Sequence, residues 1–160
     1  MNKTNKQDEH FLLEAIREAE KSVGNGGGPF GAVLVKNGEI IARAGNSVTL
    51  VNDPTAHAEV NVIRQGGEKL KTFDLSGTVI YASAEPCPMC LGAIYWANID
   101  RVVFAASRDE AAEAGFRDAM IYTELALPPE QRRLPHCHLP LQERLLPFTQ
   151  WKEKEDKTEY

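Results

Sequence analysis

Two short motifs, far apart in the chain, constrain the fold more than any other feature of this sequence. The first offers an imidazole and a carboxylate, from His57 and Glu59, and the second offers two thiols, from Cys87 and Cys90. One imidazole and two thiols leave the fourth position of a tetrahedral zinc ion open for water, whose pKa a catalytic zinc lowers to about 7. The carboxylate is surplus to a closed site but suits a proton carrier. The fold must therefore bring both motifs to one point.

Each motif is predicted to lie at the start of a helix. Asp53 is a favourable N-cap, and Pro54 is a favourable first residue, for a helix that carries His57 and Glu59. A second helix is expected to start at Cys87 and to end near residue 97, with its two cysteines one turn apart. Because a helix N-terminus carries positive partial charge, it favours thiolate over thiol. Both positions therefore suit metal ligands.

The rest of the pattern predicts a mixed sheet with helices on both faces. An amphipathic helix is expected first, and then two strands joined by the tight turn Asn37-Gly38. A strand, the cysteine-bearing helix and another strand imply a parallel pair with a right-handed crossover. A short edge strand is expected near the C-terminus. The expected ranges are 9–23 for the helix and 30–36, 39–43, 78–83, 101–106 and 139–141 for the strands.

Size, charge and cysteine usage narrow the class of protein. A chain of 160 residues suits one compact domain, and a net charge of −5 argues against a broad phosphate-binding surface, so nucleic acid is not an expected partner. The sequence has no apolar run long enough to span a bilayer and no apolar stretch at its start, so neither a membrane span nor a signal peptide is expected. Three cysteines do not form a disulfide framework. A reduced, cytoplasmic protein is expected.

Other interpretations of the ligand motifs remain open. The two spaced cysteines also occur in thioredoxin-like redox pairs, although those need no His-x-Glu motif. A structural zinc site would need further ligands, which only the sequence His136-Cys137-His138 offers. His57 alone could be an ordinary helix histidine. The combination of an open ligand set with Glu59 favours a catalytic zinc over all three.

The motifs resemble those of a known family. Segments 52–59 and 85–90 are similar to the cytidine/deoxycytidylate deaminase superfamily, of which H-x-E…P-C-x-x-C is the signature. Other segments resemble its bacterial guanine deaminases, and these are 27–32, 90–96, 111–116 and 147–160. The resemblance implies an α/β fold, a three-layer α/β/α sandwich with a mixed five-stranded sheet. It also implies one zinc ion per subunit with water as fourth ligand, and a homodimer in which about residues 136–160 of the single domain cross to the partner.

The same resemblance implies hydrolytic deamination of guanine to xanthine and ammonia. Glu59 would then shuttle a proton, and Asp118 would contact the substrate edge and assist the leaving amine, unless it is only a helix N-cap. Asn46 would bind the base, although it could be a turn residue. Phe30 would form a wall of the pocket or part of the core. Tyr160 would close the partner's pocket or end a disordered tail.

Two other functions compete with this one. A tRNA adenosine deaminase, or another nucleobase deaminase, would share the zinc motifs, but an acidic chain is poorly suited to holding RNA. A zinc-stabilised binding module without catalysis would have no use for Glu59.

Arg117 stands where the related enzymes can carry an acid, so the charge around Asp118 is expected to differ from theirs.

Overall fold

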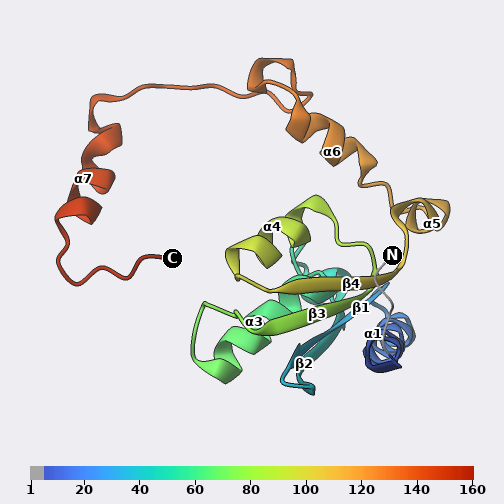
Figure 1. Cartoon of the computed structure of the whole chain (residues 1–160). Coiled ribbons are helices and arrows are strands. Elements are labelled where there is room, and N and C mark those ends of the chain that lie inside the picture. Colours follow the sequence, from blue (N-terminus) through green and yellow to red (C-terminus); the bar gives the residue numbers. More distant parts are fainter. Residues whose placement is uncertain (1–5) are drawn as a thin grey trace. The chain divides into compact units, whose positions relative to one another are not determined.

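The computed structural model describes residues 6–160, which divide into two units, one ending at Ala119 and one spanning Met120–Tyr160. In the first unit, helices flank a sheet of four strands (Figure 1). Its elements in chain order are α1 (Lys6–Gly24), β1 (Gly28–Lys36), β2 (Glu39–Asn46), α2 (Val48–Val51), α3 (Ala58–Leu70), β3 (Thr78–Ala84), α4 (Pro88–Trp96), β4 (Arg101–Ala106) and α5 (Arg108–Glu113).

The sheet has the strand order β2-β1-β3-β4, with β3 and β4 parallel and the other pairs antiparallel. As predicted, Asn37 and Gly38 form the turn between β1 and β2, and both have positive φ, 52° and 80°. These angles match the primed turns whose twist fits a two-residue hairpin. Helix α4 is the predicted crossover between the parallel strands. The hairpin and the crossover were therefore predicted correctly from the sequence.

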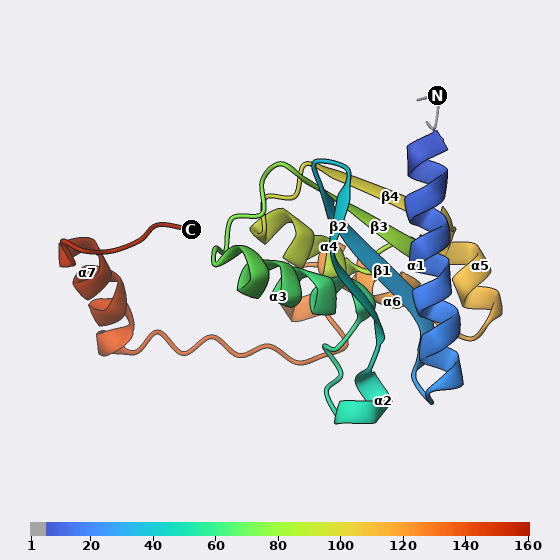
Figure 2. The same ribbon diagram turned by 90° about the horizontal axis from the view of Figure 1, so that it is seen from below.

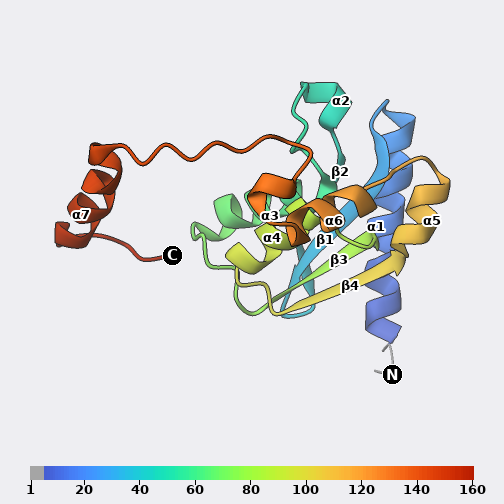
Figure 3. The same ribbon diagram turned by 90° about the horizontal axis from the view of Figure 1, so that it is seen from above.

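The core lies in two layers, one on each face of the sheet. Helices α3 and α4 cover one face, and α1 and α5 lie on the other (Figure 2 and Figure 3). Because side chains alternate along a strand, Leu34 of β1 packs toward α3 and α4, whereas Val33 and Val35 pack against Phe11 of α1. Strand β1 is buried on both faces, as expected for a central strand of an α/β sheet.

Helix α1 approaches β1 closely because Gly31 has no side chain. A Cβ atom at Gly31 would lie 2.2 Å from the carbonyl oxygen of Ala15 and 2.3 Å from the amide nitrogen of Ala19. Real Cβ contacts are more than about 1 Å longer. Ala15 itself is fully buried at this crossing. Glycine at position 31 therefore sets the separation between helix and sheet.

A charged cluster attaches the first turn of α1 to β3 and β4. Tyr81 of β3 donates a hydrogen bond from its hydroxyl group to Asp8 Oδ1 at 2.6 Å, and Arg101 of β4 donates to both carboxylate oxygens, at 2.6 and 3.1 Å. Asp8 and Tyr81 are both buried. Burial, together with the hydrogen bond to Asp8, raises the pKa of Tyr81 from 10.0 to about 12. The tyrosine therefore keeps its proton at neutral pH.

The second unit contains short helices joined by extended chain, namely α6 (Ala119–Ala126, which starts at the last residue of the first unit), η1 (Pro129–Gln131), η2 (Gln142–Leu145) and α7 (Leu146–Glu153). None of residues 120–160 is buried. The prediction of a five-stranded sheet was wrong, because the described residues form four strands and 139–141 pairs with none of them. Pro140 contributes to this, since it lacks the amide that a strand ladder needs. Among residues 6–160, no helix has the length and apolar character needed to cross a bilayer.

Candidate metal centre and active site

His57 and Cys87 occupy equivalent places at the starts of two neighbouring helices. His57 is the N-cap of α3 (φ −71°, ψ 154°), and Cys87 is the N-cap of α4 (φ −66°, ψ 168°). Neither side chain caps its own helix, so both are available as ligands. Cys90 follows in the first turn of α4 and is fully buried. The predicted helix from Pro54 was wrong: the Asp53 carboxylate accepts the Thr55 amide as an N-cap would, but the chain then forms only tight turns, and α3 begins at Ala58.

The three predicted ligands converge on one point. The Nδ1 atom of His57 lies 3.6 Å from Cys87 Sγ and 3.5 Å from Cys90 Sγ, and the two sulfur atoms are 3.5 Å apart. Zinc bonds of about 2.0–2.3 Å in a tetrahedron require ligand separations of about 3.5–3.8 Å, so this donor set fits zinc. In the described part of the chain, no other three His, Cys, Asp or Glu side chains come together in this way. The predicted zinc site is confirmed.

The electrostatics of the cluster favour a bound cation. The hydrogen bond with Cys90, followed by that with His57, lowers the pKa of the Cys87 thiol to about 4. The same contact with Cys87, together with burial, raises the pKa of Cys90, and the hydrogen bond with Cys87 raises the pKa of His57. A negative sulfur therefore faces the imidazole, and a divalent cation would deprotonate the second thiol as well.

Glu59 lies in the first turn of α3 beside these ligands. Its side chain is buried, and its Oε2 atom is 3.4 Å from Cys90 Sγ. Burial raises the pKa of the Glu59 carboxyl above its usual value. A buried carboxyl group whose protonated form is favoured in this way can both accept and donate a proton, which suits general acid–base catalysis. The arrangement therefore combines three ligands with one buried proton carrier.

Asn46, at the end of β2, is buried and held on two sides. Its side-chain oxygen accepts a hydrogen bond from the amide of Val48 at 3.2 Å, and its backbone oxygen accepts one from the Ser22 hydroxyl at 2.7 Å. Because Oδ1 already has a partner, the side-chain NH₂ group is the part suited to a ligand.

Asp118 is half-buried, and its carboxylate contributes to the raised pKa of His57, behind Cys87 and Glu59.

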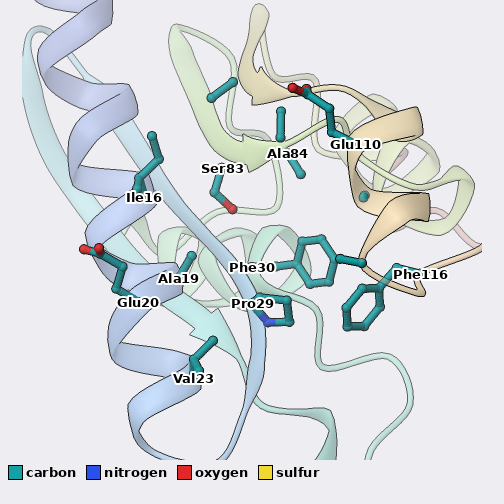
Figure 4. Close-up of a pocket in the computed structure, with 14 residues that line it drawn as sticks. Ile16, Ala19, Glu20, Val23, Pro29, Phe30, Ser83, Ala84, Glu110 and Phe116 are labelled. Atoms are coloured by element: carbon teal, nitrogen blue, oxygen red, sulfur yellow. The ribbon is translucent and has the colours of Figure 1, made fainter.

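Phe30 lies beside another aromatic side chain. Its ring meets Phe116 edge to face, with centroids 4.8 Å apart, and both rings line a pocket of about 420 Å³ between α1 and α5 (Figure 4). This pocket contains none of the metal ligands. In the second unit, Tyr160 forms an edge contact with Trp151, with centroids 6.5 Å apart.

One residue near the site was not predicted. Glu85 accepts hydrogen bonds from the backbone amide and the guanidinium of Arg108, at 3.2 and 2.8 Å. Its own amide donates to the carbonyl of Ala106 at 2.9 Å, which ties the segment before Cys87 to the end of β4. A carboxylate directly before Pro-Cys could have suggested this role, but the arginine is distant in sequence.

Comparison with known proteins agrees with this geometry. Residues 5–106 match the cytidine and deoxycytidylate deaminase zinc-binding region. The guanine deaminase of Bacillus subtilis is 50% identical over 153 residues, which cover 95% of this chain and 98% of that protein. Its X-ray structure superimposes with a TM-score of 0.93 and covers 100% of this chain and 99% of that one, at 49% identity. The tRNA-specific adenosine deaminase of the same organism is 48% identical over 62% of each chain.

The site and the comparisons lead to the same group of proteins. Both ligand motifs lie inside the matched region and form the cluster that its name implies. The similarity to guanine deaminase extends through the second unit as well. The chain belongs to the zinc-dependent cytidine and deoxycytidylate deaminase family, and within that family it is similar to guanine deaminase over nearly its whole length.

Proposed function

We propose that this protein is a zinc-dependent guanine deaminase, which converts guanine and water to xanthine and ammonia. The observation that carries this proposal is the 50% identity to Bacillus subtilis guanine deaminase over 95% of the chain. The cluster of His57, Cys87 and Cys90, with Glu59 beside it, supplies the chemistry that such a reaction needs.

His57, Cys87 and Cys90 would hold the zinc ion. When bound, zinc would lower the pKa of a water molecule to about 7 and so supply a nucleophile at neutral pH. The Glu59 carboxylate accepts a proton from the attacking water and returns it to the ring nitrogen next to C2, which makes C2 a better electrophile. The C2 carbon gains an oxygen and loses its amino group as ammonia. The buried position of Glu59 suits this role, because burial raises the pKa of its carboxyl and so favours the protonated form that donates to the base.

Asn46 and Asp118 are proposed to bind the base. Asn46 has its oxygen engaged with Val48, so it would donate from its NH₂ group to an acceptor on the purine. Asp118 is an acceptor when ionised and would face the N–H groups of guanine, where it would also assist the leaving amine. Phe30 would form a wall of the base pocket. These roles rest on the resemblance together with the burial of Asn46 and the proximity of Asp118 to His57.

We also propose a homodimer in which residues 136–160 pack on the partner and bring Tyr160 to its pocket. The second unit buries none of its own residues, although it exposes large apolar side chains such as Phe148. In the first unit, Tyr95 and Trp96 of α4 are also exposed, and β4 is an edge strand. Apolar surface on both units is typical of an oligomer interface.

Three free cysteines suit a reduced compartment, and we propose the cytoplasm.

A tRNA adenosine deaminase is the second candidate, because one such enzyme is 48% identical over 62% of this chain. Ammonia release from guanine, adenine, cytosine and a tRNA anticodon stem-loop, measured side by side, separates the candidates. We expect ammonia from guanine, with equimolar xanthine. Release from the stem-loop alone would refute the proposal, and release from no substrate by the zinc-loaded protein would favour a non-catalytic zinc module.

A further inference from the structure

Asn61 lies in α3, two residues after Glu59, and its side chain leaves the helix toward the end of β2. Its Nδ2 atom lies 3.1 Å from the carbonyl oxygen of Gly45, 3.1 Å from the hydroxyl of Ser47 and 3.3 Å from the carbonyl oxygen of Ala56. The two carbonyl oxygens fix the orientation of the amide, because the Oδ1 atom could not face them, and the Ser47 hydroxyl can accept from the same nitrogen.

These acceptors belong to two segments that carry site residues. Gly45 and Ser47 are the neighbours of Asn46 in the chain, and Ala56 directly precedes His57. The two segments also meet directly, since the amide of Ser47 donates to the carbonyl of Ala56 at 2.9 Å. Asn61 therefore joins both ends of the loop 47–56 to the helix that carries Glu59.

The opposite side of Asn46 is held by α1. The Ser22 hydroxyl donates to the backbone oxygen of Asn46, and a Cβ atom at Gly27 would lie 2.3 Å from that oxygen. Movement of the Asn46 backbone toward α1 is therefore blocked by close packing. On the side of α3, the hydrogen bonds from Asn61 to Gly45 and Ser47 hold the same strand end, next to the apolar packing between α3 and β2.

We propose that Asn61 is a positioning residue for substrate binding, which fixes Asn46 at its distance from His57 and Glu59. This inference rests on the proposed function, in which Asn46 binds the base. Asparagine is a weaker helix former than alanine, so propensity alone does not favour it at this position. Its contribution comes from the three contacts that it makes outside the helix.

The proposal separates substrate affinity from the chemical step. Asn61→Ala removes the donors but leaves the metal ligands and Glu59 in place. We expect KM for guanine to rise about tenfold, as for the loss of one or two hydrogen bonds, with kcat and zinc content little changed. Asn61→Asp keeps the shape but turns a carboxylate toward the carbonyl oxygens of Gly45 and Ala56, so its KM should rise further.

The control is Gln65→Ala, which replaces an exposed polar side chain in the same helix and should leave KM unchanged. A residue that only stabilised the fold would lower the active fraction, so kcat would fall while KM stayed constant. In the background of Asn46→Ala, the substitution of Asn61 should have no further effect on KM. Additive effects on KM would overturn the proposal.

Amide hydrogen exchange tests the same inference without turnover. We expect the Ser47 and Val48 amides of zinc-loaded Asn61→Ala to exchange about tenfold faster than in the wild type, and those of Gln65→Ala to be unchanged. Unchanged exchange, or an unchanged KM in an enzyme that deaminates guanine, refutes the positioning role and leaves the proposed function standing. If the wild type releases no ammonia from guanine, the proposed function fails, and the exchange experiment still decides whether Asn61 holds this loop.

Discussion

Replacing Gly31 with alanine should push α1 away from the sheet. The new Cβ atom would lie 2.2 Å from Ala15 O, 2.3 Å from Ala19 N and 2.8 Å from Glu18 C, and all three are backbone atoms that no side-chain rotation can move. Relief requires a shift of about 1 Å in a helix whose buried residues include Phe11. The substitution therefore perturbs the whole layer that α1 forms with β1.

The expected loss follows from overpacking. Inserting a methyl group into a well-packed core costs about 1–3 kcal/mol, and a clash with backbone places Gly31→Ala near 3 kcal/mol. Alanine also has less conformational freedom than glycine in the unfolded chain, and this effect offsets about 0.7 kcal/mol of the loss in stability. The net loss of about 2 kcal/mol should lower the melting temperature of a chain of this size by about 4–8 °C.

The matched control is Gly24→Ala at the end of α1, where a Cβ atom would meet no heavy atom within 4 Å. Its effect should be stabilising or neutral. Thermal and urea unfolding of both variants, followed by circular dichroism, give the comparison. Equal midpoints for the two variants would refute the argument that Gly31 sets the distance between helix and sheet.

Two further outcomes follow from the site and from the cluster around Tyr81. Glu59→Gln should keep its zinc, measured by metal analysis, but lose about 10²–10⁴-fold in kcat for guanine, and near-normal turnover would remove Glu59 as the proton carrier. The pKa of Tyr81 is raised from 10.0 to about 12, so the folded state holds this proton more tightly than the unfolded state. The resulting stability is complete below pH 10 and is lost as the pH rises toward 12. Urea midpoints between pH 9 and 12 should fall less steeply for Tyr81→Phe than for the wild type or for Tyr95→Phe, and parallel curves would contradict the assignment.

The local patterns predicted most of the fold around the ligands. The Asn37-Gly38 turn and the crossover helix depend on neighbouring residues, so the sequence alone was sufficient for them. The start of α3 was misplaced because the bond from the Thr55 amide to Asp53 suits both a helix N-cap and an isolated turn, and the tertiary contacts of Arg64 with Asp53 and Thr55 favour the turn. Local signals do not reveal such a competition.

The residues of the candidate site, too, could be predicted only in part from the sequence. The ligand spacing identified His57, Cys87 and Cys90, because the chemistry of zinc restricts the residue types at such a site. Asn61 carried no signal, because an asparagine in a helix is ordinary until its three acceptors are placed beside it. The fifth strand was expected both from the short pattern at 139–141 and from the resemblance, but three residues with a central proline have too little apolar alternation to specify a strand.

His57 and Cys87 lie at the N-caps of α3 and α4, and this position affects which parts of such enzymes can change without loss of the reaction. Both helices are fixed to the sheet by one apolar cluster, so the reactive centre is built on the packed core of the first unit. Asn46 and Asp118, by contrast, stand next to loops. Insertions or substitutions in those loops can change which base is accepted and leave the reactive centre intact. A single hydrolytic apparatus can thus serve a free purine in one protein and a nucleotide within RNA in another.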